Sequence, residues 1–335
     1  MSLSIRFLGT AAARPTVERN VSSLAVVREG ETMLFDCGEG TQRQMMRYGV
    51  GFTFADLFVT HWHADHFLGM LGLMRTLALQ DRTEPLRLWG PKGAERMTKK
   101  MDGLGLEKLS FPLEVRELAP GDEIARKDYR IRAFELNHRG APSLGYALVE
   151  DERRGRFNPE LAAELGIPEG PLWGRIHKGE SIVLDNGQVI EPHVLVGPTR
   201  RGRTVAITGD TRPGDATVEA ARGADLLVHE ATFADEEAQR AVDTGHSTAR
   251  EAAMVAVKAG VKRLALTHLS ARYTRDTSDL EREAREVFPA TTIARDGMEI
   301  EVPYDDDVLA PVTTAPPVPA QATAAPAPAP VQRNP

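Results

Sequence analysis

Short apolar runs separated by polar, glycine-containing turns dominate the first part of the chain, a pattern typical of β-strands joined by tight loops. The pattern predicts a first strand over Ser4–Gly9 and a hairpin formed by Ser23–Arg28 and Thr32–Asp36. The hairpin turns at Glu29–Glu31. Because Leu57–Thr60 contains three large apolar residues and no charge, we expect a further, buried strand there.

Predicted strands that are followed by a metal-ligating type of residue recur along the rest of the chain. They are Leu57–Thr60 before His61, Tyr129–Leu136 before His138, Arg203–Thr208 before Asp210, Leu226–Val228 before His229 and Glu230, and Arg263–Thr267 before His268. Between them, the pattern predicts strands over Glu84–Trp89 and Leu113–Leu118 and a helix over Ala94–Met101, and Val287–Pro303 is expected to close the domain with a strand pair. The recurring unit is therefore a strand followed by a candidate ligand.

The densest group of such residues is His61-Trp62-His63-Ala64-Asp65-His66, between the strand ending at Thr60 and a predicted helix over Phe67–Met74. Three imidazoles and one carboxylate within six residues, with no thiolate nearby, suit Zn²⁺ or Mn²⁺. A lone histidine at a strand end is usually structural. That alternative would have to hold here at four positions together, and crowding so many polar groups without a cation would be costly.

A second candidate site lies near the end of the chain, where Gly245–Glu251 leads into a helix over Ala252–Ala259 that stops at Gly260. Thr248 and Glu251 have the spacing of a capping box, so His246 should lie just before the helix N-terminus. Free backbone N–H groups and the helix dipole favour an anion such as phosphate at that position.

The segment from Asp151 to His193 differs from the rest of the chain in having little apolar periodicity. It carries basic residues and turn-forming residues, and Asn158–Leu165 predicts one short helix. We interpret residues 151–193 as an inserted flexible arm whose cations follow a phosphate backbone. The alternative is a surface insertion without a partner. Residues 305–335 are rich in Ala and Pro and are expected to be a disordered tail.

Composition places the 335-residue chain among ordinary globular proteins and leaves room for a large core, in a catalytic domain that we expect over 1–304. The net charge of −7 argues against a nucleic-acid-binding coat over the whole surface but says nothing about a local basic patch. With Cys37 as the single cysteine, no internal disulfide can form, and a small buried residue is favoured over a nucleophile. No stretch is apolar enough to span a bilayer, so we expect a cytoplasmic protein.

The candidate ligands collected by type are sufficient for two metal ions. They are His61, His63, Asp65, His66, His138, Asp210 and His268. We assign His61, His63 and His138 to one metal, Asp65, His66 and His268 to the other, and Asp210 to a bridge between them. A metal pair of this kind favours hydrolysis by in-line displacement, for which phosphodiesters are natural substrates.

The motif at His61–His66 resembles the signature of the metallo-β-lactamase superfamily. That resemblance implies an α/β fold of the αββα type, a sandwich of two mixed sheets with outer helices. Over about Met1–Pro303 the chain further resembles the short form of the ribonuclease Z family, which removes the 3′ trailer of precursor tRNA. The residues that carry the resemblance are Phe7–Thr10, Asn20–Ser23, Asp36–Gln42, Gly170–Gly174, His229–Thr232 and His246–Thr248.

Carried over residue by residue, the resemblance implies that Asp65 is both a metal ligand and the general base. His246, oriented by Glu230, would assist the leaving 3′-oxygen; a structural ion pair is the alternative. It also implies two Zn²⁺ per subunit, a tRNA 3′-hydroxyl and a 5′-phosphorylated trailer as products, and a homodimer in which one subunit's arm serves the other's site. The expected substrate-binding residues are Arg19, Asn20, Arg153, Arg154, Arg156, Arg175, Lys178, Ser247 and Thr248.

One position departs from the family pattern. The loop that commonly reads Pro-x-Lys-x-Arg-Asn has Val17 in the lysine position of Pro15–Asn20. In the family this loop helps to reject tRNAs that already carry CCA, so we hypothesise weak CCA discrimination, because valine cannot contact a phosphate as lysine does. Two other functions remain as alternatives: a hydrolase of the same fold that acts on a small ester, thioester or lactone, and a module that binds RNA without cutting it.

Overall fold

The computed structural model describes residues 2–101, 103–104, 109–184 and 186–305, which form two seven-stranded mixed sheets and a separate hairpin. In spatial order the first sheet contains β16 (Glu299–Glu301), β1 (Leu3–Gly9), β2 (Ser23–Arg28), β3 (Glu31–Phe35), β4 (Asp56–Phe58), β5 (Leu86–Pro91) and β6 (Leu113–Leu118). The second contains β15 (Thr291–Ile293), β14 (Leu264–Thr267), β13 (Leu226–Glu230), β12 (Thr204–Ile207), β9 (Leu144–Glu150), β8 (Tyr129–Glu135) and β7 (Glu123–Ala125).

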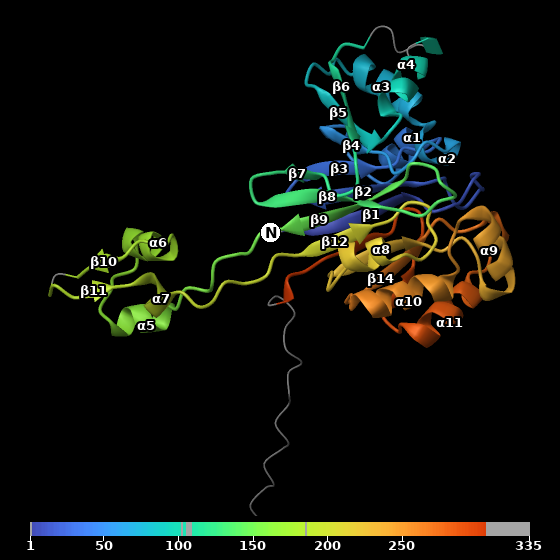
Figure 1. Cartoon of the computed structure of the whole chain (residues 1–335). Helices are drawn as coiled ribbons and strands as arrows, with labels where there is room; N and C mark the ends of the chain where they lie inside the picture. Colours follow the sequence, from blue (N-terminus) through green and yellow to red (C-terminus); the bar gives the residue numbers. More distant parts are fainter. Residues whose placement is uncertain (1, 102, 105–108, 185, 306–335) are drawn as a thin grey trace, which may run out of the picture. The chain divides into compact units, whose positions relative to one another are not determined.

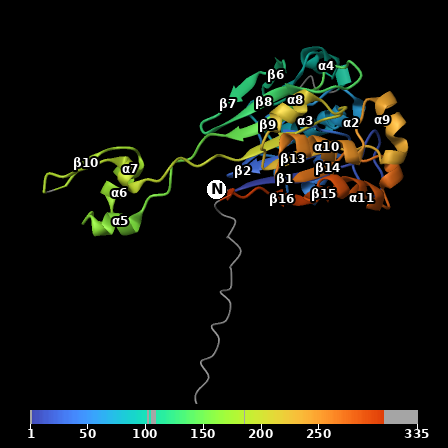
Figure 2. The same cartoon turned by 60° about the horizontal axis from the view of Figure 1, so that its bottom comes forward.

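Helices cover the outer faces of both sheets (Figures 1 and 2). The helices beside the first sheet are α1 (Thr41–Arg47), α2 (Ala64–Phe67), α3 (Met70–Leu79) and α4 (Ala94–Met101), and those beside the second are α8 (Asp215–Ala220), α9 (Ala238–Thr244), α10 (Ala249–Ala259) and α11 (Ser278–Val287). Apolar side chains fill three layers, one between the sheets and one under each set of helices. This is the predicted αββα sandwich.

The two sheets are joined by aromatic packing close to the candidate ligands. The Phe58 ring stacks on Phe35 at 4.8 Å between centroids and meets the edge of Tyr146, from the opposite sheet, at 5.2 Å. The Tyr146 hydroxyl donates to the carbonyl of Val59 at 2.7 Å, and the Leu144 N–H donates to the carbonyl of Thr60 at 2.9 Å. These contacts fix the end of β4 against the second sheet.

Parallel pairing gathers the strand ends that carry the candidate ligands. Strands β3 to β6 are parallel neighbours in the first sheet, and β12 to β15 are parallel neighbours in the second. The loops after β4 and β12 touch directly, since a Cβ on Gly209 would lie 2.5 Å from Thr60 Oγ1. Glycine is therefore required beside Asp210, and the ligands after both strands meet at one edge of the sandwich.

The prediction that Val287–Pro303 closes the domain with a strand pair is wrong. Strands β15 and β16 do not pair with each other, because β15 extends the second sheet beside β14 and β16 extends the first beside β1. The turn between them crosses from one sheet to the other, which local alternation of apolar and polar residues cannot reveal. Strand β9 was not predicted at all, although six of its seven residues are buried.

The arm has a small core of its own. Its elements are α5 (Pro159–Glu164), α6 (Pro171–His177), β10 (Ile182–Val183), β11 (Val189–Ile190) and α7 (Pro192–Leu195). The buried residues of this core are Ala162, Ile167, Ile176, Ile182, Ile190 and Leu195. The chain enters and leaves through antiparallel bridges between Arg153 and Arg200 and between Phe157 and Val196, so the fold of the arm extends a few residues past 193.

Two further expectations concerned membrane-spanning segments and the C-terminal tail. None of the helices in the described part of the chain has the length and hydrophobicity that a membrane span requires. Of the predicted disordered tail at 305–335, residues 306–335 lie outside the described residues, which end at Asp305.

Candidate metal centre

The first group of candidate ligands consists of His61, His63, His138 and Asp210, whose ligand-type atoms all lie within 4.8 Å of one another. The hydrogen bonds behind the rings fix which nitrogen faces the centre. His138 Nδ1–H donates to the carbonyl of Gly245 at 2.9 Å, so Nε2 keeps its lone pair toward His63 Nδ1, 3.2 Å away. Such outer contacts commonly set the tautomer of a metal-binding histidine.

The second group consists of Asp65, His66 and His268. His66 Nδ1 lies 2.6 Å from a carboxylate oxygen of Asp36, and His268 Nδ1 lies 3.1 Å from the hydroxyl oxygen of Thr232. The Nε2 atoms of both rings therefore face inward, 3.3 Å apart. Asp36 and His268 also have positive φ angles of 58° and 57°, a backbone strain that often marks functional positions.

Asp210 lies between the two groups and is 3% exposed. Its Oδ1 lies 3.2 Å from His66 Nε2 and 3.1 Å from His268 Nε2, whereas its Oδ2 lies 3.6 Å from His61 Nε2. One carboxylate thus turns one oxygen toward each group, which is the arrangement that a bridging ligand needs.

The residues fit divalent cations. His61 Nε2 is buried and has no hydrogen-bond partner among the described residues, and Asp210 Oδ1 faces two imidazole nitrogens without forming a hydrogen bond of ordinary geometry, although buried polar atoms are nearly always paired. Burial, assisted by the charge of His66, holds the pKa of His61 well below its ordinary value, so this ring is neutral and able to ligate. A cation at the convergence of these atoms would satisfy the unpaired lone pairs, whereas a purely structural cluster leaves them unpaired.

The pKa of His66 is shifted in the opposite direction from that of His61. Burial alone would lower its pKa, but the carboxylates of Asp210 and Asp36 raise it well above the ordinary value. The second group therefore holds a proton when no cation is present. A metal ligand must be deprotonated, so binding of a cation here would release that proton.

His246 and Glu230 form a hydrogen-bonded pair beside the two groups. His246 Nδ1 lies 3.0 Å from Glu230 Oε1 and 3.8 Å from Asp210 Oδ2. Burial disfavours the charged imidazole, but the Glu230 carboxylate outweighs that effect and raises the pKa of His246 to about 9. Glu230 is held in turn by the backbone N–H groups of Thr211 and Thr232. The pair presents a protonated imidazole at the edge of the centre.

The predicted capping box is confirmed, because Thr248 caps α10 and exchanges hydrogen bonds with Glu251. This arrangement uses the Thr248 side chain, and the buried Ser247 hydroxyl donates to the carbonyl of Thr211 at 2.6 Å. Both side chains thus make hydrogen bonds within the protein behind His246, and the substrate contact expected from the sequence stays a prediction.

The N-terminal loop also differs from that expectation. Arg19 is 6% exposed, and its guanidinium donates to Thr10 Oγ1 and to the carbonyl of Ala294, each at 2.7 Å. The Asn20 side chain donates to the carbonyl of Glu39 at 2.8 Å. Both side chains brace the loop, so direct contact of Arg19 with substrate is not what this structure shows. Val17, in contrast, is 94% exposed.

The basic residues predicted in the arm come from two stretches that the fold brings together. Arg154 donates to the carbonyl of His177 at 2.8 Å, and His177 Nε2 lies 3.0 Å from the carbonyl of Gly155. Arg153, Arg154 and Arg156 thus lie next to the segment that contains Arg175 and Lys178. Arg175 also pairs with Glu180, and both side chains are about half exposed.

Sequence reasoning gave no role to the residues behind the ligands, namely Asp36, Thr60 and Thr232. The signals for Asp36 were its position at the end of a predicted strand and its place in the stretch Asp36–Gln42, but its contact with His66 spans 30 residues of sequence and was not predicted. The expectation that Cys37 is a small buried residue is confirmed. Its side chain is fully buried, and burial raises the pKa of the thiol to about 12, which disfavours a nucleophilic thiolate.

Comparison with known proteins places this site in a family. Residues 3–153 match the family described as Anti-Pycsar protein Apyc1, and residues 193–269 match the beta-lactamase superfamily domain. Ribonuclease Z of Gemmatimonas aurantiaca is 65% identical over 92% of this chain and 98% of its own length. Ribonuclease Z of Myxococcus xanthus is 52% identical over 91% of this chain and 99% of its own length.

A solved structure agrees with these relatives. The crystal structure of human tRNase Z, short form, has a TM-score of 0.65 and 31% identity, over 90% of this chain and 99% of that one. Together with the two sheets and the histidine and aspartate groups between their strand ends, these likenesses show that the chain belongs to the ribonuclease Z family of the metallo-β-lactamase fold.

Proposed function

We propose that this protein is a metal-dependent endoribonuclease that removes the 3′ trailer of precursor tRNA and leaves a tRNA 3′-hydroxyl and a 5′-phosphorylated trailer. The observation that carries the proposal is the position of Asp210 between two groups of histidines, in a chain 65% identical to a ribonuclease Z. The donor set of imidazoles and carboxylates favours two Zn²⁺ per subunit, with Mn²⁺ as the alternative. Given this substrate, we place the reaction in the cytoplasm.

In the proposed reaction, water attacks the scissile phosphate and the 3′-oxygen of the tRNA leaves. Bound divalent cations would supply Lewis acidity that activates water and stabilises charge on the phosphate. Asp65 Oδ2 faces His268 at 3.3 Å and accepts from the Ala13 N–H at 2.8 Å. Its Oδ1 has no partner among the described residues, and we assign this oxygen to accept the proton of the attacking water.

On the other side of the bond, His246 donates a proton to the leaving 3′-oxygen. Glu230 holds the imidazole through Nδ1, so Nε2 is the atom that delivers the proton. The raised pKa keeps the ring protonated at neutral pH, which is the form that a general acid requires. Glu230 is a positioning residue, because it acts only through His246.

Cleavage of a 3′-extended precursor tRNA by the purified protein tests the proposed function. We expect a single cut at the 3′ end of the tRNA, lost after chelation, restored by Zn²⁺ or Mn²⁺, and lost in Asp65→Ala. A protein that binds divalent metal and hydrolyses small esters but leaves every precursor intact would contradict the proposal and favour a small-molecule substrate.

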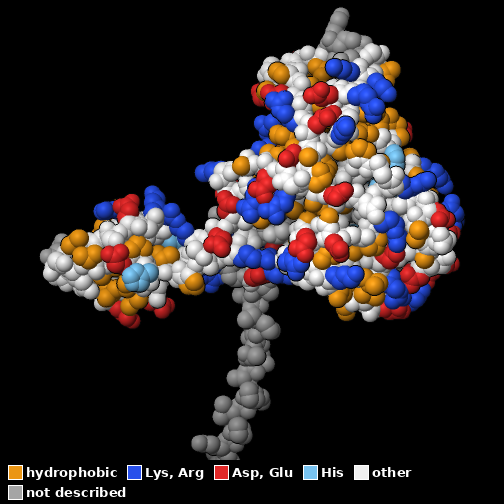
Figure 3. Space-filling model, viewed as in Figure 1, with side chains coloured by type: hydrophobic (Ala, Val, Ile, Leu, Met, Phe, Trp, Pro, Cys, Tyr) orange, Lys and Arg blue, Asp and Glu red, His pale blue; other side chains and the backbone are white. Residues whose placement is uncertain are grey.

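We propose that the cations of the arm bind the body of the tRNA, at a distance from the cleavage site. The arm has no excess of positive charge, since residues 151–193 contain five Lys and Arg against eight Asp and Glu. Its cations are concentrated instead, and Figure 3 shows blue side chains over α6. Neither family match covers residues 154–192, whereas the ribonuclease Z relatives align over more than nine tenths of the chain. This supports a role specific to that family.

Removing the arm should weaken RNA binding and spare the chemistry. The Gly197 N–H donates to the carbonyl of Arg156 at 2.9 Å, so joining these two residues through a short glycine linker removes residues 157–196 with little strain. We expect KM for precursor tRNA to rise about tenfold or more, because phosphate contacts are lost. Hydrolysis of bis(p-nitrophenyl) phosphate, which is too small to reach the arm, should not change.

The same deletion tests the proposed homodimer. If one subunit's arm serves the other's site, co-expression of the armless chain with full-length Asp65→Ala should give mixed dimers that cleave precursor tRNA, although neither chain cleaves it efficiently alone. Lack of rescue in isolated mixed dimers would show that the arm serves its own subunit. A monomer in sedimentation would contradict the dimer itself.

Val17 provides a further prediction. Because this valine is 94% exposed on the loop beside the centre, Val17→Lys should place an ammonium there without disturbing the core. We expect the substitution to lower cleavage of a precursor with encoded CCA several-fold relative to one without CCA. Val242→Lys on α9, 53% exposed, is the matched control. Equal inhibition by CCA in the unmodified protein and Val17→Lys would contradict the hypothesis of weak discrimination.

A further inference from the structure

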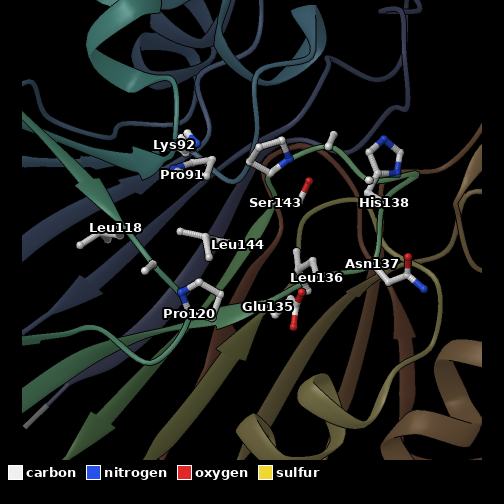
Figure 4. Close-up of a pocket in the computed structure, with 14 residues that line it drawn as sticks. Pro91, Lys92, Leu118, Pro120, Glu135, Leu136, Asn137, His138, Ser143 and Leu144 are labelled. Atoms are coloured by element: carbon white, nitrogen blue, oxygen red, sulfur yellow. The ribbon is translucent and has the colours of Figure 1, made fainter.

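A cavity of about 430 Å³ lies beside the candidate metal centre and shares only His138 with the two ligand groups. It lies between the ends of β5, β6 and β8 and the start of β9. Figure 4 shows the hollow between Leu118, Leu136 and Leu144, with Pro91 and Pro120 at its sides and His138 at its edge. Because His138 belongs to the first ligand group and also lines the cavity, the cavity adjoins the candidate metal centre.

Three polar side chains line this cavity without a partner of their own. Lys92, Glu135 and Asn137 are exposed, and the structure gives their side chains no hydrogen bond or ion pair within the described residues. A fourth lining residue, Ser143, is 5% exposed, and its hydroxyl also has no partner among the described residues. A buried hydroxyl left unpaired is unusual in a folded protein, and a ligand in the cavity would satisfy it after rotation of the side chain.

The combination of apolar walls and mixed polar groups fits a nucleobase. A base has flat faces that pack on proline and leucine side chains, and an edge with both donors and acceptors. Glu135 can accept from an exocyclic amino group, Asn137 can donate or accept, and the Lys92 ammonium can donate to a ring nitrogen or a carbonyl oxygen of the base. The volume is in the range of small-ligand sites and too small for a duplex, so the nucleotide must be unpaired.

We propose that this cavity binds the base of one of the two nucleotides that flank the scissile phosphate. The inference rests on the proposed function and extends it, because it assigns a base-binding subsite to residues outside the hydrolytic centre. A phosphate held at the centre has an attached nucleotide on each side, and His138 links the centre to the cavity wall. The base that enters would position the phosphate and contribute to the choice of cleavage site.

The test uses precursor tRNAs in which the base on one side of the cleavage site, or on the other, is replaced by an abasic ribose. For the full-length protein, we expect kcat/KM to fall about tenfold with one of these two substrates, in line with the loss of one base contact. The abasic substrate that shows the loss identifies on which side of the scissile phosphate the bound base lies. Cleavage of the unmodified precursor is measured first, and its absence would overturn both this inference and the proposed function.

A variant that fills the cavity provides the second part of the test. Ala119→Trp, at an exposed position that lines the cavity, should cause the same loss with the unmodified precursor and no further loss with the sensitive abasic substrate. Ala125→Trp, at an exposed alanine outside the cavity, is its control. Lys92→Ala, with Lys127→Ala as control, gives the same comparison with little risk to the fold.

Hydrolysis of bis(p-nitrophenyl) phosphate separates the subsite from the hydrolytic centre. The cavity variants should retain this activity, because the small ester has no base to place. If neither abasic position affects kcat/KM, or if Ala119→Trp and Lys92→Ala lose as much activity on abasic as on unmodified RNA, the cavity does not bind a base.

Discussion

Replacing Asp210 with alanine should reduce cleavage of precursor tRNA by about 10³-fold or more and lower the amount of bound metal. The carboxylate lies between the two ligand groups, with its oxygens 3.1 Å from His268 Nε2 and 3.6 Å from His61 Nε2. Removing it withdraws a ligand from both groups at once, and the activation of water and the stabilisation of phosphate charge are each worth several kcal/mol. Metal content by mass spectrometry, measured together with kcat, checks this expectation.

Two controls separate loss of metal from loss of fold. Asp215→Ala removes an exposed carboxylate at the start of α8 and should leave both metal content and kcat unchanged. Thermal unfolding of Asp210→Ala, compared with chelated unmodified protein, shows whether the sandwich persists. An Asp210→Ala protein that keeps full metal content and activity would show that this carboxylate is not a ligand.

Replacing His246 with alanine should lower kcat for precursor tRNA by about 10²- to 10⁴-fold, the usual contribution of a general acid. Metal content should stay the same, because the ring belongs to neither main ligand group and is held by Glu230. The loss should be much smaller with bis(p-nitrophenyl) phosphate. Its p-nitrophenolate leaves without a proton, whereas the 3′-oxygen of ribose does not.

The leaving-group comparison makes this prediction specific. A purely structural role for His246 would lower the activity on both substrates alike, and a role as metal ligand would lower the metal content, since His246 also lies near Asp210 and His268. Glu230→Gln should show a milder form of the same pattern, because the amide can still orient the ring but no longer favours its charged form. Equal losses on both substrates would exclude the assignment as general acid.

Four of the seven candidate ligands were predictable from sequence because each follows a predicted strand. His61, His138, Asp210 and His268 follow β4, β8, β12 and β14, and the ends of these strands meet at one edge of the sandwich. The capping box of α10 was predictable for a similar reason, since Thr248 and Glu251 interact within one helical turn. The candidate ligands were thus predicted from local periodicity, and the capping box from the spacing of residues that interact locally.

Long-range contacts were not predictable in this way. The partnership of Asp36 with His66 spans 30 residues, and that of Thr232 with His268 spans 36. Nothing in the local pattern shows that Arg19, expected at the substrate, is instead buried against Thr10 and Ala294. The crossing of the chain from β15 to β16 depends in the same way on the assembled sheets.

The most direct test of the account is to map both ends of the cut in a 3′-extended precursor tRNA at single-nucleotide resolution, before and after removal of metal. The account predicts one metal-dependent cut at the 3′ end of the tRNA, with a 3′-hydroxyl on the tRNA and a 5′-phosphate on the intact trailer. A trailer shortened one nucleotide at a time, a cut with a 3′-phosphate on the tRNA, or full activity after metal removal would contradict it.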